Sequence, residues 1–141
     1  MLLFAHGVFE KYPRLRLVLI EGGSAWLPSL LWRFDTEYKG LRREVPWVKR
    51  LPSEYFAEHV WVSSQPLEIS PKREQVIELL RSMHLEDKLM YSSDYPHWDA
   101  DELDYLATRL PAEWHSRVFF ENACRLYGWD PEELKKHDLL E

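Results

Sequence analysis

The sequence contains very little cysteine, and its single residue, Cys124, cannot form a disulfide within the chain. Such scarcity is typical of a reducing compartment, so we expect a cytoplasmic protein. Cys124 lies in a helical pattern, which favours a buried thiol over a nucleophile. Long apolar runs are also missing, and the apolar start at residues 1–5 is cut short by His6 and Gly7. The sequence therefore predicts neither a membrane span nor a signal peptide.

Long runs of basic residues are absent too, and the net charge is -6. This acidic balance argues against a nucleic-acid partner or an anionic membrane surface. A phosphate-binding loop is not expected, because Gly22-Gly23 is not followed by a lysine and a serine or threonine. The 141 residues are 45% hydrophobic, which is enough for one domain with an apolar core.

Three short apolar segments rich in branched residues are predicted as β-strands, at 15–20, 60–64 and 88–93. Helical patterns separate them. The clearest is the stripe at 27–41, where apolar residues recur at steps of three and four. Strands that alternate with helices favour right-handed crossovers and a parallel sheet, so the sequence predicts an α/β fold.

The chain is expected to form one domain, residues 1–141. A second helix between strands should be capped by Ser70 and opened by Pro71. Further helices are predicted at 103–109, 112–120 and 122–127. We divide the domain into a leading helix (1–14), three strand and helix units (15–99) and carboxyl-terminal helices (100–141).

Polar side chains follow each predicted strand. Because the carboxyl ends of parallel strands meet at one rim of a sheet, we expect Glu21, Ser64 and Asp94 to lie near one another, with His97 beside them. Two carboxylates and a histidine could perform acid-base chemistry or hold part of a divalent metal site. The alternative is that Asp94 only binds backbone amides at the turn before Pro96.

The other histidines lack a metal-binding pattern, since the sequence has neither His-x-His nor His-x-x-x-His. His59 precedes its strand and should lie at the opposite rim, in a structural role. Surface or capping roles are expected for His6, His84, His115 and His137. His97 differs because it follows Asp94 in the same loop, although stacking on Trp98 is an alternative.

Several sequence blocks resemble the amidohydrolase-related family, which includes aminocarboxymuconate-semialdehyde decarboxylase and the resorcylate decarboxylases. The first block runs from Phe9 to Gly23 and continues into Trp26-Leu27-Pro28. The second is Ser-Asp-Tyr-Pro-His-Trp-Asp, residues 93–99, and the third is Glu-Asn-Ala, residues 121–123. The resemblance covers residues 7–129.

The resemblance implies the carboxyl-terminal portion of a TIM-like (β/α)8 barrel in a metal-dependent hydrolase. Its substrate would be a small carboxylated or cyclic molecule, and the reaction hydrolysis or decarboxylation. Asp94 matches a metal ligand or acid-base residue; the divalent metal would be zinc, with manganese as the alternative. Glu21 falls where the decarboxylases carry a histidine and is expected to act as the base. His97 is expected to polarise the substrate, and further substrate contacts are expected from Trp98, Ser64 and Trp26.

The resemblance also predicts what this sequence does not supply. The histidine pair of the first barrel strand and a mid-barrel histidine have no counterpart here, so metal could be absent from this chain. A complete barrel needs about 250 residues, so 141 cannot close one. We therefore expect a homo-oligomer or a separate amino-terminal barrel half as partner. The alternative to an enzyme is a non-catalytic remnant or assembly subunit.

Overall fold

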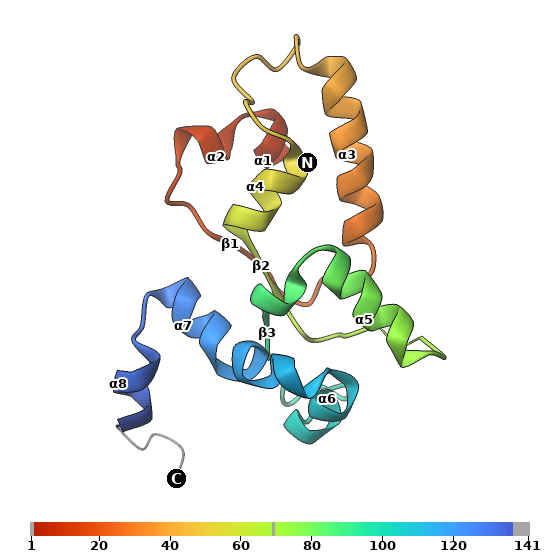
Figure 1. Ribbon diagram of the computed structural model, residues 1–141, viewed down its shortest axis with the longest axis vertical. Helices are drawn as coiled ribbons and strands as arrows, with labels where there is room; N and C mark the ends of the chain where they lie inside the picture. The colour runs from red at the N-terminus through yellow and green to blue at the C-terminus, as the bar shows by residue number, and fades with distance from the viewer. Residues whose placement is uncertain (1, 69, 137–141) are drawn as a thin grey trace.

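The computed structural model describes residues 2–68 and 70–136 (Figure 1). Short strands lie between two groups of helices, with α1 to α4 on one side and α6 to α8 on the other. The elements in chain order are α1 (Leu2–Ala5), α2 (Val8–Lys11), β1 (Leu17–Leu19), α3 (Leu27–Leu41), α4 (Pro52–His59), β2 (Val60–Ser63), α5 (Arg73–Ser82), the 3₁₀ turn η1 (Leu85–Asp87), β3 (Leu89–Met90), α6 (Leu103–Arg109), the 3₁₀ turn η2 (Ala112–Trp114), the π-helical turn η3 (Arg117–Glu121), α7 (Asn122–Tyr127) and α8 (Pro131–Lys136).

The sheet has three parallel strands in the order β1-β2-β3, as the alternation of strands and helices predicts. Leu19 pairs with Val62, and Val62 pairs with Leu89, so the three strands end at nearly the same level. Every residue of the central strand β2 is buried, whereas β1 is only partly buried. The α/β fold class with a parallel sheet is confirmed.

The strands are shorter than the predicted segments at both outer positions. The first strand, β1, ends at Leu19: Ile20 is already 65% exposed, and the amide of Glu21 donates to the hydroxyl of Ser63. In β3, the chain leaves the ladder after Met90, because the Tyr91 amide donates to the carbonyl of Val118. These competing bonds come from distant parts of the chain, so the length of an apolar run overestimates the strand.

A core of buried apolar side chains joins the sheet to its helices. Leu27 and Leu31 contribute from α3, within its predicted apolar stripe, and Ile77 and Leu80 contribute from α5. Asn122 fixes α7 to β3, since its buried amide donates to the carbonyls of Leu89 (2.8 Å) and Glu86 (3.0 Å). Further core residues are Phe9, Tyr55, Phe56, Val60, Val62, Leu85, Leu89, Leu106, Leu110, Trp114 and Val118.

Helix boundaries depart from the predictions in two places. The leading helix is split at Gly7, which has a left-handed φ of 63° and lies against Trp47, where a Cβ atom would approach Cδ1 to 2.6 Å. The second crossover helix begins at Arg73 rather than Pro71, because the Ser70 hydroxyl accepts from the Lys72 amide (3.2 Å) ahead of the helix.

A third difference lies near the carboxyl end, where the predicted helix at 112–120 is replaced by η2 and η3. His137 lies outside the described residues.

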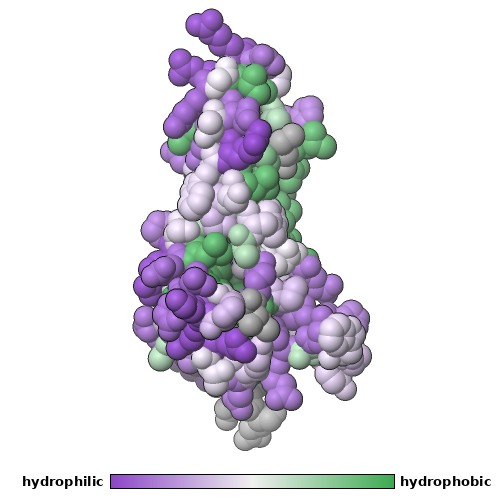
Figure 2. Space-filling model, turned by 90° about the vertical axis from the view of Figure 1, so that its right-hand side faces the viewer, coloured by the Kyte–Doolittle hydropathy of each residue, from purple (hydrophilic) through white to green (hydrophobic). Residues whose placement is uncertain are grey.

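Large apolar side chains remain at the surface of the described chain, and Figure 2 shows hydrophobic areas among the hydrophilic ones on one face. Those more than half exposed are Leu2, Tyr12, Ile20, Trp32, Tyr95, Trp98, Tyr127 and Trp129. None of the helices within residues 2–68 and 70–136 has the length and apolar character needed to cross a bilayer.

Candidate active-site rim

The end of β1 is tied to the end of β2 through Glu21. Its backbone has a left-handed φ of 54°, and its amide donates a 3.0 Å hydrogen bond to the Ser63 hydroxyl. Parallel pairing brings the two strand ends to the same rim, and the side chain of Glu21 is exposed there. The loop after β1 thus presents an exposed carboxylate beside the end of β2.

The end of β2 is tied in turn to the segment after β3. The hydroxyl of Ser64 accepts a 3.0 Å hydrogen bond from the Ser92 amide, and Gln65 Nε2 donates to the carbonyl of Asp99 (3.1 Å). Both side chains are at most 2% exposed. Ser64 therefore joins two strand ends, and its predicted contact with substrate stays a prediction.

Asp94 and His97 form a hydrogen-bonded pair in the loop after β3. His97 Nδ1 lies 2.8 Å from Asp94 Oδ2, and the aspartate side chain is 12% exposed while the imidazole is 63% exposed. The hydrogen bond and the charge of Asp94 raise the pKa of His97, and the carboxylates of Glu21 and Asp99 raise it further. Residues from the loops after β1 and β3 thus act on one imidazole, and the structure brings together three of the predicted site residues.

Two indole rings flank this rim. Trp26 is 42% exposed, and its Nε1 donates a 2.7 Å hydrogen bond to the Gly22 carbonyl, so its ring is held over the loop after β1. Trp98 is 96% exposed, one residue after His97. Their predicted role as substrate contacts is untested, but both offer flat apolar surface on loops of the rim.

Glu68 holds the turn between β1 and α3 in place, a contact that the sequence did not indicate. Its carboxylate accepts hydrogen bonds from the amides of Ser24 and Ala25 (2.7 Å each) and from the Ser24 hydroxyl (2.9 Å). Gly23 has a φ of 65°, and a Cβ atom there would lie 2.5 Å from Glu68 Oε1. The only signal in the sequence is a Gly-Gly-Ser turn before a helix, whose free amides need an acceptor.

The described residues do not complete a metal site. Among residues 2–68 and 70–136, no group of three or more histidine, cysteine, aspartate or glutamate side chains is arranged to hold an ion. Asp94 offers one carboxylate, and its nearest imidazole is already its hydrogen-bond partner. His59 is buried at the amino end of β2, as predicted, where its Nδ1 lies 2.9 Å from the carbonyl of Leu15.

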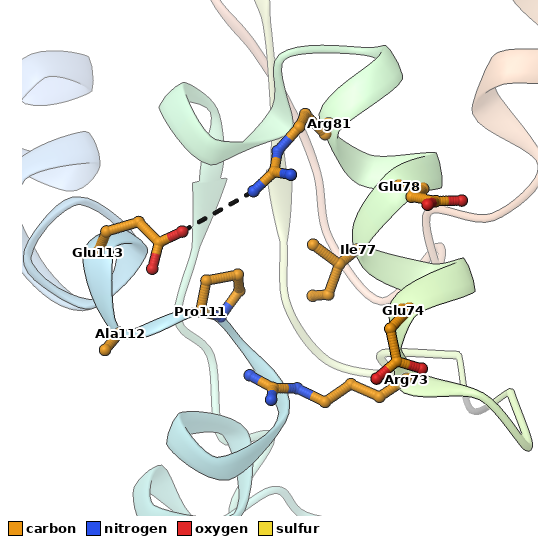
Figure 3. Close-up of a pocket in the computed structure, with 8 residues that line it drawn as sticks. All are labelled: Arg73, Glu74, Ile77, Glu78, Arg81, Pro111, Ala112 and Glu113. Carbon is orange, nitrogen blue, oxygen red and sulfur yellow. Dashed lines mark ion pairs between the residues drawn. The ribbon is translucent and has the colours of Figure 1, made fainter.

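Grooves elsewhere on the surface do not involve the strand ends. One of about 480 Å³ lies between α5 and residues 111–113 (Figure 3), where Arg81 pairs with Glu113 at 3.8 Å. Arg73 also borders it but donates to the carbonyls of Arg109 and Leu110. The second groove, about 400 Å³, is apolar and lies between α1, α3 and residues 45–52.

Two comparisons identify the relatives of this sequence. The protein-family model for amidohydrolases matches residues 1–129. The gamma-resorcylate decarboxylase of Rhodococcus jostii (strain RHA1) is 29% identical over 127 residues, which is 88% of this chain and 34% of the relative. The enzyme of the same name from Rhizobium radiobacter is 28% identical over 135 residues, covering 91% of this chain and 38% of the relative.

Solved structures agree with this assignment of the fold. An amidohydrolase from Mycobacterium avium subsp. paratuberculosis K-10 superposes with a TM-score of 0.69 at 24% identity, covering 88% of this chain and 31% of its own. A 5-carboxyvanillate decarboxylase from Novosphingobium aromaticivorans DSM 12444, complexed with manganese and 4-hydroxy-3-methoxy-5-nitrobenzoic acid, has a TM-score of 0.64 at 24% identity, covering 89% and 36%. The chain thus spans about a third of the length of these relatives. From its matched residues and its parallel strands, the chain belongs to the amidohydrolase family and has part of its TIM-like barrel fold.

Proposed function

We propose that this chain supplies one sector of the active site of a metal-dependent amidohydrolase-type enzyme, and that the reaction is the decarboxylation of a small aromatic acid. The observation that carries the proposal is the Asp94–His97 pair at the end of β3, acted on by Glu21 from the end of β1. Both curated relatives and one of the two solved ones are named as decarboxylases, which supports a lyase over the hydrolase that the resemblance implied.

A divalent metal belongs to this proposal, and Asp94 would be the ligand that this chain contributes. Manganese is supported by the solved relatives that contain it, and zinc remains the alternative. A divalent ion would polarise an oxygen of the substrate and neutralise its charge. The described residues lack a group of three ligands, so the site would need further ligands from outside them, from a second copy of the chain or from another barrel segment.

The residues of the rim have separate roles in the proposed chemistry. Decarboxylation breaks the bond between a ring carbon and the carboxylate, releases CO2 and puts a proton on that carbon. The pKa of His97 is raised by Asp94, so the imidazole holds a proton closer to neutral pH and can hydrogen-bond to a substrate oxygen. Glu21 would act as the base: it would take up a proton from solvent and give it to the ring carbon as CO2 leaves. Asp94, as the metal ligand, would also hold His97 in place through its hydrogen bond. Trp26 and Trp98 would pack against the aromatic ring.

The proposal is tested on the 141-residue protein by manganese titration in a calorimeter and by CO2 release from 2,6-dihydroxybenzoate. We expect Asp94→Asn to weaken manganese binding at least tenfold, because a neutral amide is a poorer ligand than a carboxylate. Asp104→Asn is the matched control, since this exposed aspartate lies in α6 away from the strand ends. Equal manganese affinity in both variants, or a metal-free protein, would contradict the proposal for this chain.

A non-catalytic assembly subunit is the second candidate function. It is favoured by the missing group of three ligands among the described residues and by the exposed aromatic side chains. It predicts a metal-free oligomer in size-exclusion chromatography with light scattering. A monomer that binds manganese through Asp94 would rule it out.

A further inference from the structure

The end of α3 and the loop that leads to α4 form a strongly basic segment, residues 39–50. It contains five lysines and arginines and one acid, whereas the whole chain has a net charge of -6. Four of its cations form no ion pair with any described residue: Lys39, Arg42, Arg43 and Lys49. Leu41 (46% exposed) and Trp47 (49% exposed) lie among them. The basic segment thus presents unpaired positive charge together with exposed apolar surface.

The basic segment is fixed to the body of the protein. Trp47 Nε1 donates a 2.7 Å hydrogen bond to the carbonyl of Ala5, and the Val48 side chain is buried in the core. The Tyr38 hydroxyl donates to the carbonyl of Val48 as well (2.9 Å). Because these contacts already hold the backbone, a partner that binds here would have little of this segment to order.

A second segment, residues 99–104, has the opposite charge. It leads into α6 and contains four acids and no lysine or arginine. None of the four acids forms an ion pair with a described residue. Burial and then the charge of Asp99 raise the pKa of Asp101, against an opposing effect of Arg109. This acidic segment therefore holds like charges close together, without a cation bound to any of them.

The two segments do not meet within one copy of the chain. Figure 1 shows the end of α3 and its loop among helices α1 to α4, whereas α6 belongs to the group on the other side of the short strands. A second copy offers each segment the opposite charge. Two copies that lie side by side in opposite directions would bring each basic segment to the acidic segment of the other copy, which is the self-complementary arrangement of a two-fold dimer.

We propose that the basic segment is a docking surface for the acidic segment of a second copy, in an antiparallel dimer. Four unpaired cations would face four unpaired acids in each of the two contacts. Both segments also supply apolar surface, since Leu103 (49% exposed) and Tyr105 (38% exposed) lie at the acidic one. Complementary charge steers this association and disfavours the parallel arrangement, in which like charges would face each other.

A second copy accounts for both segments, and other partners account for only one. A nucleic acid or an anionic membrane would bind the basic segment alone. Either would be repelled by the rest of the chain, whose net charge is negative. The dimer is independent of the proposed reaction, because neither segment is assigned a role in the chemistry.

The first test uses the unmodified 141-residue protein in sedimentation velocity, and we expect a reversible dimer. Raising the NaCl concentration from about 0.1 M to about 1 M shortens the range of charge interactions from ~10 Å to ~3 Å. The Kd of the dimer should therefore rise roughly tenfold or more. A protein that stays monomeric up to concentrations on the order of 1 mM, or a dimer that is indifferent to salt, would overturn the proposal.

The second test reverses the charge of each segment. Arg42→Glu with Arg43→Glu should make the protein monomeric, and so should Glu102→Lys with Asp104→Lys, because like charges then face each other in both contacts. An equal mixture of these two double variants should form a heterodimer. In that mixture the reversed segments face each other, and so do the two unmodified ones.

The matched control is Arg14→Glu with Lys72→Glu, which changes the net charge equally at two exposed cations outside both segments. This control should dimerise like the unmodified protein, and circular dichroism checks that every variant is folded. Reversal variants that still dimerise as the control does would overturn the assignment of the surface. A mixture of folded reversal variants that stays monomeric would overturn the pairing of the basic segment with the acidic one.

Discussion

Replacing Glu68 with alanine should destabilise the turn that carries Glu21 and leads into α3. The carboxylate accepts three hydrogen bonds from Ser24 and Ala25 across 43 or 44 residues of sequence. Hydrogen bonds to a charged group contribute about 1.5–3 kcal/mol each, but these three share one partly exposed carboxylate. We therefore expect the free energy of unfolding to fall by about 2–4 kcal/mol.

Urea denaturation followed by circular dichroism measures this loss, and hydrogen exchange at the amides of Ser24 and Ala25 locates it. The melting temperature should fall by roughly 5–15 °C. Glu68→Gln retains an acceptor oxygen without the charge, so its effect should be smaller, about 1 kcal/mol.

Glu78→Ala is the matched control, because Glu78 is exposed in the middle of α5. A surface change of this kind normally stays within about 0.5 kcal/mol. If Glu68→Ala is no more destabilising than this control, or if both amides exchange at the wild-type rate, the assigned role of Glu68 is wrong.

Three further predictions follow from the contacts and charges described above. An NMR titration should give His97 a pKa above its ordinary value, and the Asp94→Asn substitution should lower that pKa. The stability that the Asp94–His97 pair contributes is fully present below pH 6.5. It is lost as the pH rises through the raised pKa of His97. Because burial lowers the pKa of Lys88 to about 8, urea titrations should show the free energy of unfolding rising from about pH 8 toward pH 10.5, a trend that Lys88→Met should remove. Asn122→Ala should cost about 2–4 kcal/mol in urea denaturation, because it leaves two backbone carbonyls, including that of Leu89, without their donor.

The order of elements and the parallel sheet could be predicted because they depend on local patterns. Branched apolar residues mark β2, and steps of three and four mark α3. The ends of the outer strands could not be predicted, because they depend on distant partners. The Tyr91 amide bonds to Val118 in η3, and no pattern around Tyr91 indicates that contact.

The same distinction applies to the candidate site. Asp94 and His97 are three residues apart in one loop, and sequence alone brings them together. Glu21 could be placed at the same rim because the direction of parallel strands fixes its end of the sheet. The hydrogen bonds of Ser64 with Ser92 and of Glu68 with Ser24 could not be predicted from the sequence. They depend on loop conformations that only the folded backbone defines.

Two acids of the rim have left-handed backbone conformations, with φ of 54° at Glu21 and 57° at Asp94. Glycine would adopt these angles freely, and replacing Glu21 with glycine would gain roughly 1 kcal/mol after the added flexibility of the unfolded chain is subtracted. At position 94 the loss of the hydrogen bond to His97 would offset part of this gain. Directed evolution that rewards only heat resistance should therefore enrich glycine at positions 21 and 94. A library screened for catalysis as well should keep the carboxylates, and comparing the two populations would separate what folding requires from what chemistry requires.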